Sequence, residues 1–377
     1  MKKVKLGDLV TVMNEREDNP SQSKYDRFVG LEHYDSGSVS ITRWGSTEML
    51  VSAMKVFHRG DILVARRNVY LKRASSVDFD GITSGDSIIL HVNDEQYKDI
   101  VPFVLNTDSF WDYADQHSDG SMSKRLAPKT MLEYEFTLPD DGEVERLSTL
   151  LWSMERTKTA YKNLIAKTEE LVKSQFVEMI QPLLDTGNTI PLGELVETDR
   201  PITYGILKPG TGFPGGVPVV KVKDMKDGLI DQSDLLLTSP EIDNSYKRSR
   251  LRAGDLLISI RGSVGRMAEV PENLENANIT QDTARLTIKK EYNKVYVRGV
   301  LESQPLQHDM EKNIRGVAVK GINIGYLREL GIPMCSRSKQ DELAALYIQS
   351  DKSKFAAQQA LADLTATQKA LMRQYLG

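Results

Sequence analysis

The chain has 377 residues, a formal net charge of −4, 40% apolar residues and a single cysteine. This length predicts two or three domains, and the apolar content is sufficient for packed cores, which argues against disorder. The lone Cys335 excludes an intramolecular disulfide, no run approaches the ~20 apolar residues of a membrane span, and the charged N-terminus does not resemble a secretory signal. We therefore expect a soluble protein of the reducing cytoplasm.

The first half of the chain predicts a β-rich domain followed by a long helix. Short apolar runs at 62–64 and 87–90 lie between turn residues and are typical of strands, and a short helix is expected around 97–105. From Glu143 to about Ile180 the pattern is helical, and Pro182 is expected to end the helix after Gln181. Gly187 and Asn188 then turn the chain into its second half.

The second half repeats this order. Strands are expected at 217–222 and 256–260, a short helix at 296–302, and a second long helix from about Ser338 to Leu376. Each half is thus predicted to be a mixed α/β unit followed by a helix.

Sequence landmarks indicate that the halves are copies of one design. Leu6-Gly7-Asp8-Leu9-Val10 recurs 186 residues later, and Gly60-Asp61-Ile62-Leu63 recurs after 194 residues as Gly254-Asp255-Leu256-Leu257. Leu138-Pro139 matches Ile332-Pro333, again 194 residues apart, and the long helical segments align at 196. Chance agreement is the alternative, but four landmarks in one order favour a repeat.

Each long helix carries a heptad pattern that predicts a coiled-coil seam, and the natural partner of each helix is the other one. Small and polar seam residues bury little apolar area, so further partners are also expected. The residues predicted for the seam or for partner docking are Leu147, Leu150, Met154, Tyr161, Leu164, Leu171, Leu343, Leu346, Ala357, Ala360, Leu364 and Leu371.

The residues that would form a catalytic centre are absent. The glycine-rich segment 210–216 is not followed by the Lys and hydroxyl residue of a phosphate-binding loop, and Asn19-Pro20 lacks the second proline and the aromatic residue of an amino-methyltransferase. Asp224 and Lys226 lack the upstream acidic partner of a metal nuclease, and the five histidines show no short ligand spacing. We predict a chain without catalytic residues and without a metal or cofactor of its own.

Local charge is more informative than the total, which argues against nonspecific coating of nucleic acid. Residues 55–73 and 247–266 each contain six basic residues and one acidic residue, and each stretch surrounds a Gly-Asp landmark. A single basic run is usually a solvated surface, but two at equivalent positions favour two DNA-binding faces, with Lys and Arg on phosphates and a few side chains reading bases. The candidate DNA-binding residues are Arg66, Arg67, Lys72, Arg73, Tyr204, Lys208, Lys221, Lys223, Ser259, Arg261, Ser263 and Arg266.

The order of several strings resembles the DNA specificity subunit of type I restriction-modification systems. In the second half these strings begin at Ile190-Pro191-Leu192-Gly193-Glu194-Leu195 and at Tyr204-Gly205-Ile206-Leu207-Lys208-Pro209-Gly210. They continue at 219–225, 258–265, 278–282 and 321–333, whereas the first half matches the family only at 27–34 and 81–86. Divergence between the halves is expected if each reads a different half-site.

The resemblance implies an α+β fold with two target-recognition domains, at 1–141 and 186–335, and two long antiparallel spacer helices, at 142–185 and 336–377, related by a pseudo-twofold repeat. It also implies a phage-defence role in which the chain reads a bipartite, asymmetric DNA target with half-sites roughly one helical turn, ~34 Å, apart. Methyltransferase subunits, two in number, would bind S-adenosylmethionine. A translocase-nuclease subunit, using ATP and Mg²⁺ for restriction, is a further expected partner.

Two rival interpretations stay open at this point. One is a specificity subunit of another restriction class, whose partner fuses methyltransferase and nuclease. The other is a coiled-coil scaffold with two protein-binding heads.

Overall fold

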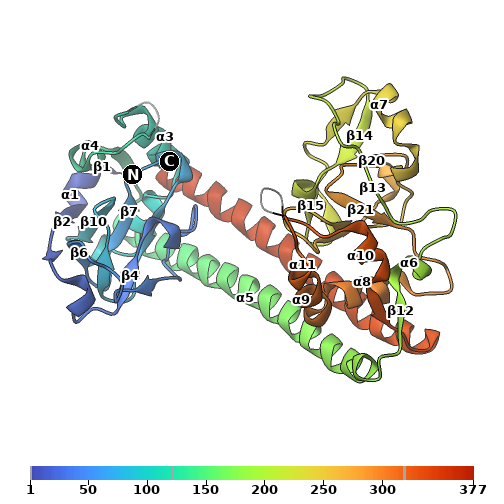
Figure 1. Cartoon of the computed structure of the whole chain (residues 1–377). Helices are drawn as coiled ribbons and strands as arrows, with labels where there is room; N and C mark the ends of the chain where they lie inside the picture. The colour runs from blue at the N-terminus through green and yellow to red at the C-terminus, as the bar shows by residue number, and fades with distance from the viewer. Residues whose placement is uncertain (1, 121–122, 317–319) are drawn as a thin grey trace. The chain divides into compact units, whose positions relative to one another are not determined.

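The computed structural model describes residues 2–120, 123–316 and 320–377, and its fold is α+β (Figure 1). The chain forms two compact units: one contains the residues up to Asn163 together with Ala357–Gly377, and the other is Leu164–Ala356. The boundary falls within the two long helices, α5 (Asp141–Asp185) and α11 (Arg337–Leu376), so each unit contains one half of each helix. No helix among the described residues is long and apolar enough to cross a membrane.

The first unit is built on a four-stranded and a five-stranded sheet. The orders are β2-β10-β7-β8 and β3-β6-β9-β4-β5, and β1 pairs with β11. The strands are β1 (Lys2–Lys5), β2 (Val10–Met13), β3 (Arg16–Glu17), β4 (Arg27–Val29), β5 (Gly45–Ser46), β6 (Met54–Phe57), β7 (Ile62–Ala65), β8 (Ala74–Ser76), β9 (Gly81–Thr83), β10 (Ser87–Val92) and β11 (Glu135–Leu138). The short helices are α1 (Leu6–Leu9), η1 (Pro20–Gln22), η2 (Leu31–His33), η3 (Val69–Leu71), η4 (Glu95–Tyr97), α2 (Val101–Val104), α3 (Asp108–Gln116) and α4 (Pro128–Leu132).

The second unit has a four-stranded sheet, β13-β21-β18-β19, and a three-stranded sheet, β17-β14-β20, with two further strand pairs. Its strands are β12 (Thr189–Pro191), β13 (Thr203–Tyr204), β14 (Val217–Val220), β15 (Met225–Lys226), β16 (Leu229–Ile230), β17 (Leu236–Thr238), β18 (Leu256–Ser259), β19 (Met267–Glu269), β20 (Asn278–Ile279), β21 (Thr283–Leu286) and β22 (Gly331–Pro333). Its short helices are α6 (Leu192–Leu195), η5 (Val222–Asp224), α7 (Pro240–Ser245), η6 (Lys247–Ser249), η7 (Glu272–Leu274), α8 (Lys294–Glu302), α9 (Gln304–Lys312) and α10 (Ile324–Glu329). The predicted helix at 296–302 is therefore present, whereas the region 97–105 contains the end of η4 and the four-residue helix α2 in place of one helix.

Strand pairing confirms the internal repeat. In the first unit β10 lies antiparallel to β2 and β7, and β7 to β8; in the second, β21 lies antiparallel to β13 and β18, and β18 to β19. Ile89 pairs with Leu63, and Arg285 pairs with Leu257, so Ile89 and Arg285 occupy the same register position. Each unit also contains one parallel strand pair, β4 with β9 and β14 with β20.

The repeated Gly-Asp landmark is a turn with a buried carboxylate. Gly60 and Gly254 have φ values of +92° and +83°, which favour glycine. Asp61 and Asp255 are 1% and 2% exposed. Each carboxylate accepts a hydrogen bond from the backbone N–H three residues earlier, at 2.8 Å for Asp61 and 2.7 Å for Asp255. Because a buried carboxylate requires such partners, the recurrence of this string reflects the architecture of the turn.

One predicted landmark is shifted. Leu6 N–H donates to the carbonyl of Tyr134, and its counterpart Leu192, 186 residues later, donates through its N–H to the carbonyl of Leu330, so Tyr134 and Leu330 correspond at an offset of 196. Ile332 is therefore equivalent to Phe136, and its match with Leu138 was wrong by two residues. In a strand, a shift of two keeps the same face inward, which is why the apolar pattern did not expose the error.

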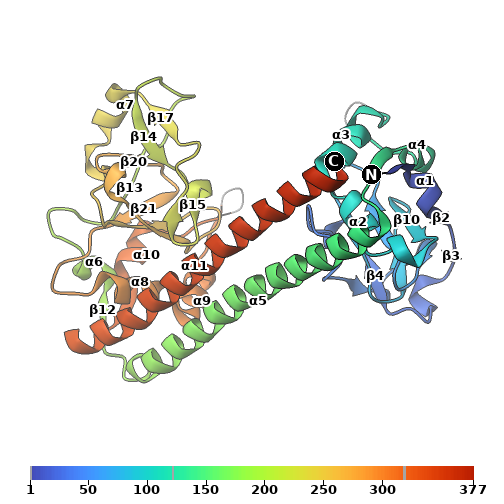
Figure 2. The ribbon, with the colours of Figure 1, turned by 180° about the vertical axis from the view of Figure 1, so that it is seen from behind.

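The long helices run antiparallel within each unit (Figures 1 and 2). In the second unit Glu169 pairs with Lys354, and the ring of Phe176 lies 5.6 Å from that of Tyr347. Residue numbers that increase along α5 therefore face residue numbers that decrease along α11, as antiparallel helices require. In the first unit Met372 and Leu376, near the end of α11, lie in the same core as Val144, Leu147 and Leu151 of α5.

The predicted seam is wrong for several leucines. Leu150, Leu164 and Leu171 are 47%, 55% and 57% exposed, and Leu346 is 37% exposed. The buried positions include residues that the heptad assignment missed, namely Leu151, Glu155, Lys158, Phe176, Ile180, Ala344, Tyr347, Gln368 and Met372. Three of these are polar, so a search for apolar heptads found only part of the seam, including the buried Leu147, Met154, Leu343 and Ala357.

The first long helix continues past the predicted stop. Pro182 lies inside α5, which ends at Asp185. Proline removes one backbone donor and restricts the turn before it, but only three helical residues follow it here. Gly187, with φ +67°, then ends the helix as expected for a left-handed glycine after a C-terminus.

Candidate nucleic-acid interface

Several predicted DNA-binding residues of the second unit gather around the turn at 279–282. Ile206 N–H donates to the Ile279 carbonyl and Gln281 N–H donates to the Ile206 carbonyl, which brings the segment from Tyr204 to Lys208 to this turn. Arg261 Nη1 donates to Gln281 Oε1 at 2.9 Å. Tyr204, Lys208 and Arg261 are all exposed, so segments that carry an aromatic ring and two accessible cations meet at this turn.

Glycine explains how closely this face is packed. A Cβ on Gly205 would lie 1.9 Å from the Ile279 carbonyl oxygen. Only glycine therefore allows the Tyr204 strand to approach the 279–282 turn, which gives the Tyr-Gly-Ile string a physical reason.

The hairpin between β18 and β19 presents the next candidates. Gly262 and Gly265 have φ values of +72° and +84°, and Ser263 and Arg266 are exposed. Ser259 differs from the expectation, because it is 0% exposed, its hydroxyl donates to the Ser263 carbonyl, and it accepts from Arg266 N–H at 2.9 Å. Ser259 thus fixes the hairpin and is not accessible to DNA in this structure.

Two of the remaining basic candidates of the second unit, Arg266 and Lys223, have internal partners. Arg266 Nη1 donates to the carbonyls of Val222 and Met225 at 3.3 and 3.2 Å. Lys223 lies 3.2 Å from Asp234, and both are exposed, so this ion pair contributes little stability. Lys221 is half-buried at the end of β14.

In the first unit the four predicted basic residues are half-buried, and three of them have internal partners. Arg67 Nε lies 2.9 Å from Asp86, and Lys72 Nζ lies 2.6 Å from Asp108. Arg73 donates to the carbonyls of Leu31 and Arg67. Two of the six basic residues in this stretch are therefore paired with carboxylates, and a run of sequence could not reveal partners that are distant along the chain.

Cations still crowd one part of this unit. Burial, with Arg66 and Arg16 nearby, lowers the pKa of Lys55 below its ordinary value. Between Asn68 and Lys72, both in the left-handed region, the short turn η3 exposes Tyr70, which is 68% accessible.

A second exposed group in the first unit was missed by sequence reasoning. Trp44 is 45% exposed, Met49 is 88% and Val51 is 95% exposed. The guanidinium of Arg27 lies 4.5 Å from the ring centre of Trp44, a cation–π arrangement. A long polar segment with scattered apolar residues offers no periodic signal, so this loop had no sequence signature.

No group of three or more metal-ligating side chains occurs within 2–120, 123–316 and 320–377.

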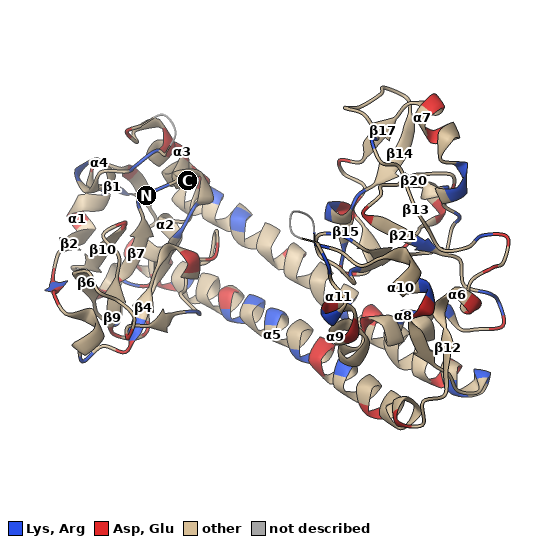
Figure 3. Ribbon diagram, in the orientation of Figure 1, with Lys and Arg blue, Asp and Glu red and all other residues tan. Residues whose placement is uncertain are grey.

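In Figure 3 lysine and arginine are interspersed with acidic residues along both long helices, while the second unit also carries basic segments near β13 and after α7.

The chain is similar to known proteins in sequence and in fold, although no family model matches it. A type I restriction enzyme specificity subunit, EcoBI of Escherichia coli, is 28% identical over 288 residues, which is 67% of this chain and 60% of that protein. The resemblance predicted from the sequence is confirmed. The chain thus spans about three fifths of the curated specificity subunit that it matches.

Solved structures show the same fold along the whole chain. A type I specificity subunit from M. genitalium covers 100% of this chain and 96% of its own, with a TM-score of 0.57 and 13% identity. A chain from a study of complex assembly and conformational transition in a type I restriction-modification system covers 99% of this chain and 97% of its own, with a TM-score of 0.54 and 19% identity. The α+β architecture with two long helices is therefore that of specificity subunits.

Proposed function

We propose that this chain is the DNA-recognition subunit of a type I restriction-modification system, in which each unit reads one half of a bipartite target. The observation that carries the proposal is the repeated sheet with its Gly-Asp turn, found in a chain homologous to a specificity subunit. The two units share a frame and differ in their exposed loops, as two readers of different half-sites require. The target is accordingly asymmetric.

The exposed side chains support contact with DNA. In the second unit the exposed residues Tyr204, Lys208, Arg261 and Ser263 provide stacking, charge and hydrogen-bonding groups, which suits phosphate contacts with a few base contacts. In the first unit Tyr70 and the accessible parts of Arg66 and Arg67 are the corresponding groups. With a net charge of −4, binding by the chain alone is weak and falls steeply with salt.

The chain selects the site, and its partners carry out the chemistry. Methyltransferase subunits supply S-adenosylmethionine, and a translocase-nuclease subunit uses ATP and Mg²⁺ for restriction. The chain itself contributes neither cofactor nor catalytic residue to this scheme.

The exposed leucines of α5 are the proposed docking stripe for two methyltransferase subunits. Leu150, Leu164 and Leu171 recur at multiples of seven residues and so lie on one face of the helix, and Leu346 is the equivalent of Leu150 on α11. Exposed apolar side chains aligned in this way are typical of a protein-binding surface. The double variant Leu164→Glu/Leu171→Glu should fold and fail to co-purify with the methyltransferase subunit, whereas Lys162→Glu, an exposed polar position on the same helix, should co-purify normally.

The decisive experiment is methylome sequencing of cells with and without the gene, after co-purification of the intact chain. The proposal predicts a bipartite, asymmetric methylated sequence that disappears on deletion and returns with the intact gene. The rival restriction class predicts a co-purifying partner that fuses methyltransferase and nuclease. Recovery of other proteins without any methyltransferase, and an unchanged methylome, would favour the scaffold and refute the proposal.

A further inference from the structure

The second unit contains a basic cavity whose lining residues do not include the 279–282 turn. Its volume is about 680 Å³, and its walls carry seven arginine or lysine residues against two acidic ones. It lies between the segment before β13, the turn at 247–252 and strand β21. Every lining residue belongs to this one unit.

Two arginines of the cavity wall are buried and incompletely bonded. Arg285 is 1% exposed and Arg200 is 8% exposed. Arg285 donates through Nη2 to the Pro201 carbonyl at 3.2 Å, while its Nε has no hydrogen-bond partner among the described residues. Arg200 Nη2 contacts Asp255 at 3.0 Å, but its Nη1 is likewise without a described partner. Buried donors without acceptors are costly, so a ligand that accepts hydrogen bonds would stabilise this site.

The positive charge of the cavity is only partly balanced. Asp255 pairs with Arg200, Asp243 with Arg250, and Glu197 lies 3.5 Å from Arg252. Within the part of the chain that the structure describes, no carboxylate lies within ion-pair distance of four other basic lining residues, Lys247, Arg248, Arg285 and Arg328. The acidic lining residues, Asp199 and Glu275, are exposed and form no ion pair there. The net charge of the walls therefore favours an anion.

The pKa of Arg285 supports the same conclusion. Burial, followed by repulsion from Arg200, lowers it to about 10. An arginine in this condition is stabilised by an added negative charge.

Comparison of the two units shows that the fold does not require this cavity. The position of Arg285 in β21 is occupied by Ile89 in β10, which is 0% exposed. The shared frame therefore accepts a wholly apolar side chain there. A buried guanidinium at that position is thus a property of the second unit alone.

The loop that carries Arg200 is also confined to the second unit. In the first unit Val10 pairs with Val92 and Met13 with Ile89, so both strands advance by three residues. In the second unit Val196 bridges Ile288 and Thr203 pairs with Arg285, so one strand advances by seven residues while the other advances by three. Four extra residues are therefore looped out between Val196 and Thr203, and this loop brings Arg200 to the buried Arg285.

We propose that this cavity is a binding site for a phosphate group. Planar guanidinium groups match the geometry of phosphate oxygens, and a pair of buried arginines beside exposed Lys247 and Arg248 forms a site that attracts and then holds such a group. The phosphate has two possible sources, the DNA backbone and a free phosphate compound. Binding of a DNA-backbone phosphate rests on the proposed function, whereas the affinity of the cavity for a phosphate group does not.

Binding of inorganic phosphate to the full chain, measured by calorimetry in phosphate-free buffer, provides the first arm of the test. Arg285→Ile, which installs the first unit's residue, should weaken binding at least tenfold and leave the circular dichroism spectrum unchanged. The double variant Lys247→Ala/Arg248→Ala removes only exposed side chains, so it keeps the test valid if Arg285→Ile fails to fold, and it should weaken binding severalfold. Lys312→Ala, an exposed lysine outside the cavity, is the matched control and should bind as the parent does.

Anisotropy with a duplex of unrelated sequence at low salt provides the second arm. If the cavity holds a backbone phosphate, the cavity variants weaken DNA binding, inorganic phosphate competes with DNA, and the salt slope falls by about one. If it holds a free phosphate compound, the variants lose phosphate binding and retain DNA binding. Parental binding of both phosphate and DNA by both cavity variants would overturn the site. If the proposed function is wrong, the result is different: the parent chain binds phosphate through these residues but binds no DNA.

Discussion

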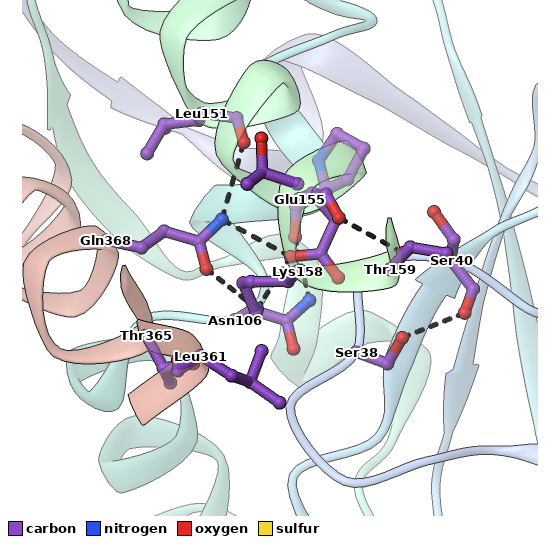
Figure 4. A network of polar contacts seen from close by, with 12 residues as sticks. Ser38, Ser40, Asn106, Leu151, Glu155, Lys158, Thr159, Leu361, Thr365 and Gln368 are labelled. Carbon is purple, nitrogen blue, oxygen red and sulfur yellow. Dashed lines mark hydrogen bonds and ion pairs between the residues drawn. The ribbon is translucent and has the colours of Figure 1, made fainter. Parts of the chain in front are cut away.

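A buried polar network between the long helices allows a quantitative test of the first unit. Lys158 Nζ donates to Glu155 Oε2 at 2.7 Å and to Gln368 Oε1 at 2.9 Å, and Gln368 Nε2 reaches the Leu151 carbonyl at 3.4 Å (Figure 4). The side chains of Lys158 and Glu155 are only 9% and 7% exposed. The perturbation is Lys158→Met, which keeps the length of the side chain and removes its charge.

The expected loss of stability follows from the burial of the remaining carboxylate. After the substitution, the Gln368 amide, at 3.3 Å, is the one side-chain donor that the described residues leave to the Glu155 carboxylate. Removing one partner of a buried ion pair typically costs ~3–5 kcal/mol, because the other charge is left uncompensated. At ~2–4 °C per kcal/mol for a unit of this size, the melting temperature of the first unit should fall by roughly 6–20 °C.

The assay combines calorimetry with amide hydrogen exchange, which localises the opening to one unit. Lys162→Met, one turn further along α5 at an exposed position, is the control and should change stability by less than ~0.5 kcal/mol. The triple variant Glu155→Leu/Lys158→Met/Gln368→Leu should recover most of the loss, since apolar replacement of a whole buried network is often neutral or stabilising. If Lys158→Met costs no more than Lys162→Met, the network does not have the energetic role assigned to it.

Three further predictions concern the repeat and the helices. Gly205→Ala should destabilise the second unit by several kcal/mol, because its Cβ would lie 1.9 Å from a backbone oxygen. Gly85→Ala, which has open space around it, is the control and should be neutral. Chemical denaturation of both variants measures the difference, and equal midpoints would contradict the prediction. Asp255→Ala should lower the stability of the second unit by ~3–5 kcal/mol, since it removes the carboxylate paired with buried Arg200, and a loss below ~1 kcal/mol in thermal unfolding would be inconsistent with this role. Insertion of seven residues after Asn163 and seven after Gln359 adds two helical turns, about 10 Å, to each helix. The methylated half-sites should then lie about three base pairs further apart. An unchanged spacer in the methylome would exclude the helices as the determinant of spacing.

The sequence predicted the frame of the protein because the frame depends on short patterns. The bounds of α11 were predicted to within one residue at its start, and strands β7, β10 and β18 lie where apolar runs lie between turn residues. The Gly-Asp landmark was recognised because a left-handed glycine followed by a buried carboxylate tolerates few substitutions. These features are local, so they can be read without knowing what contacts them.

Contacts between distant segments were beyond this kind of reasoning. The ion pairs of Arg67 with Asp86 and of Lys72 with Asp108 turn part of a basic run into internal structure. The burial of Ser259 depends on how its hairpin closes. In the same way, the sequence does not distinguish Arg285 from an exposed charged residue. Its burial depends on the pairing of β21 with β18, in which Arg285 lies opposite Leu257. Charge counts therefore could not show which basic side chains of a region remain free to bind.

The seam between the helices was mispredicted for a reason that bears on specificity. At the offset of 196, Glu155 and Lys158 correspond to Asp351 and Lys354, whereas Gln368 corresponds to Val172, so the first network is not duplicated in the second unit. There, Lys354 pairs with Glu169, and burial raises the pKa of Asp351. Each half of the helix pair thus has its own polar contact between the two helices, Lys158 with Gln368 in one half and Lys354 with Glu169 in the other.

A shift of one helix by a heptad would leave the buried Lys158 and Glu155 without the Gln368 amide, at the cost of unsatisfied polar groups. An apolar seam of small residues would tolerate such a shift far better. The polar seam residues that weakened the sequence signal are therefore the ones that fix the register of the helices, as a buried polar residue does in other coiled coils. If the helices set the spacing between two half-sites, a unique register is a requirement of that function.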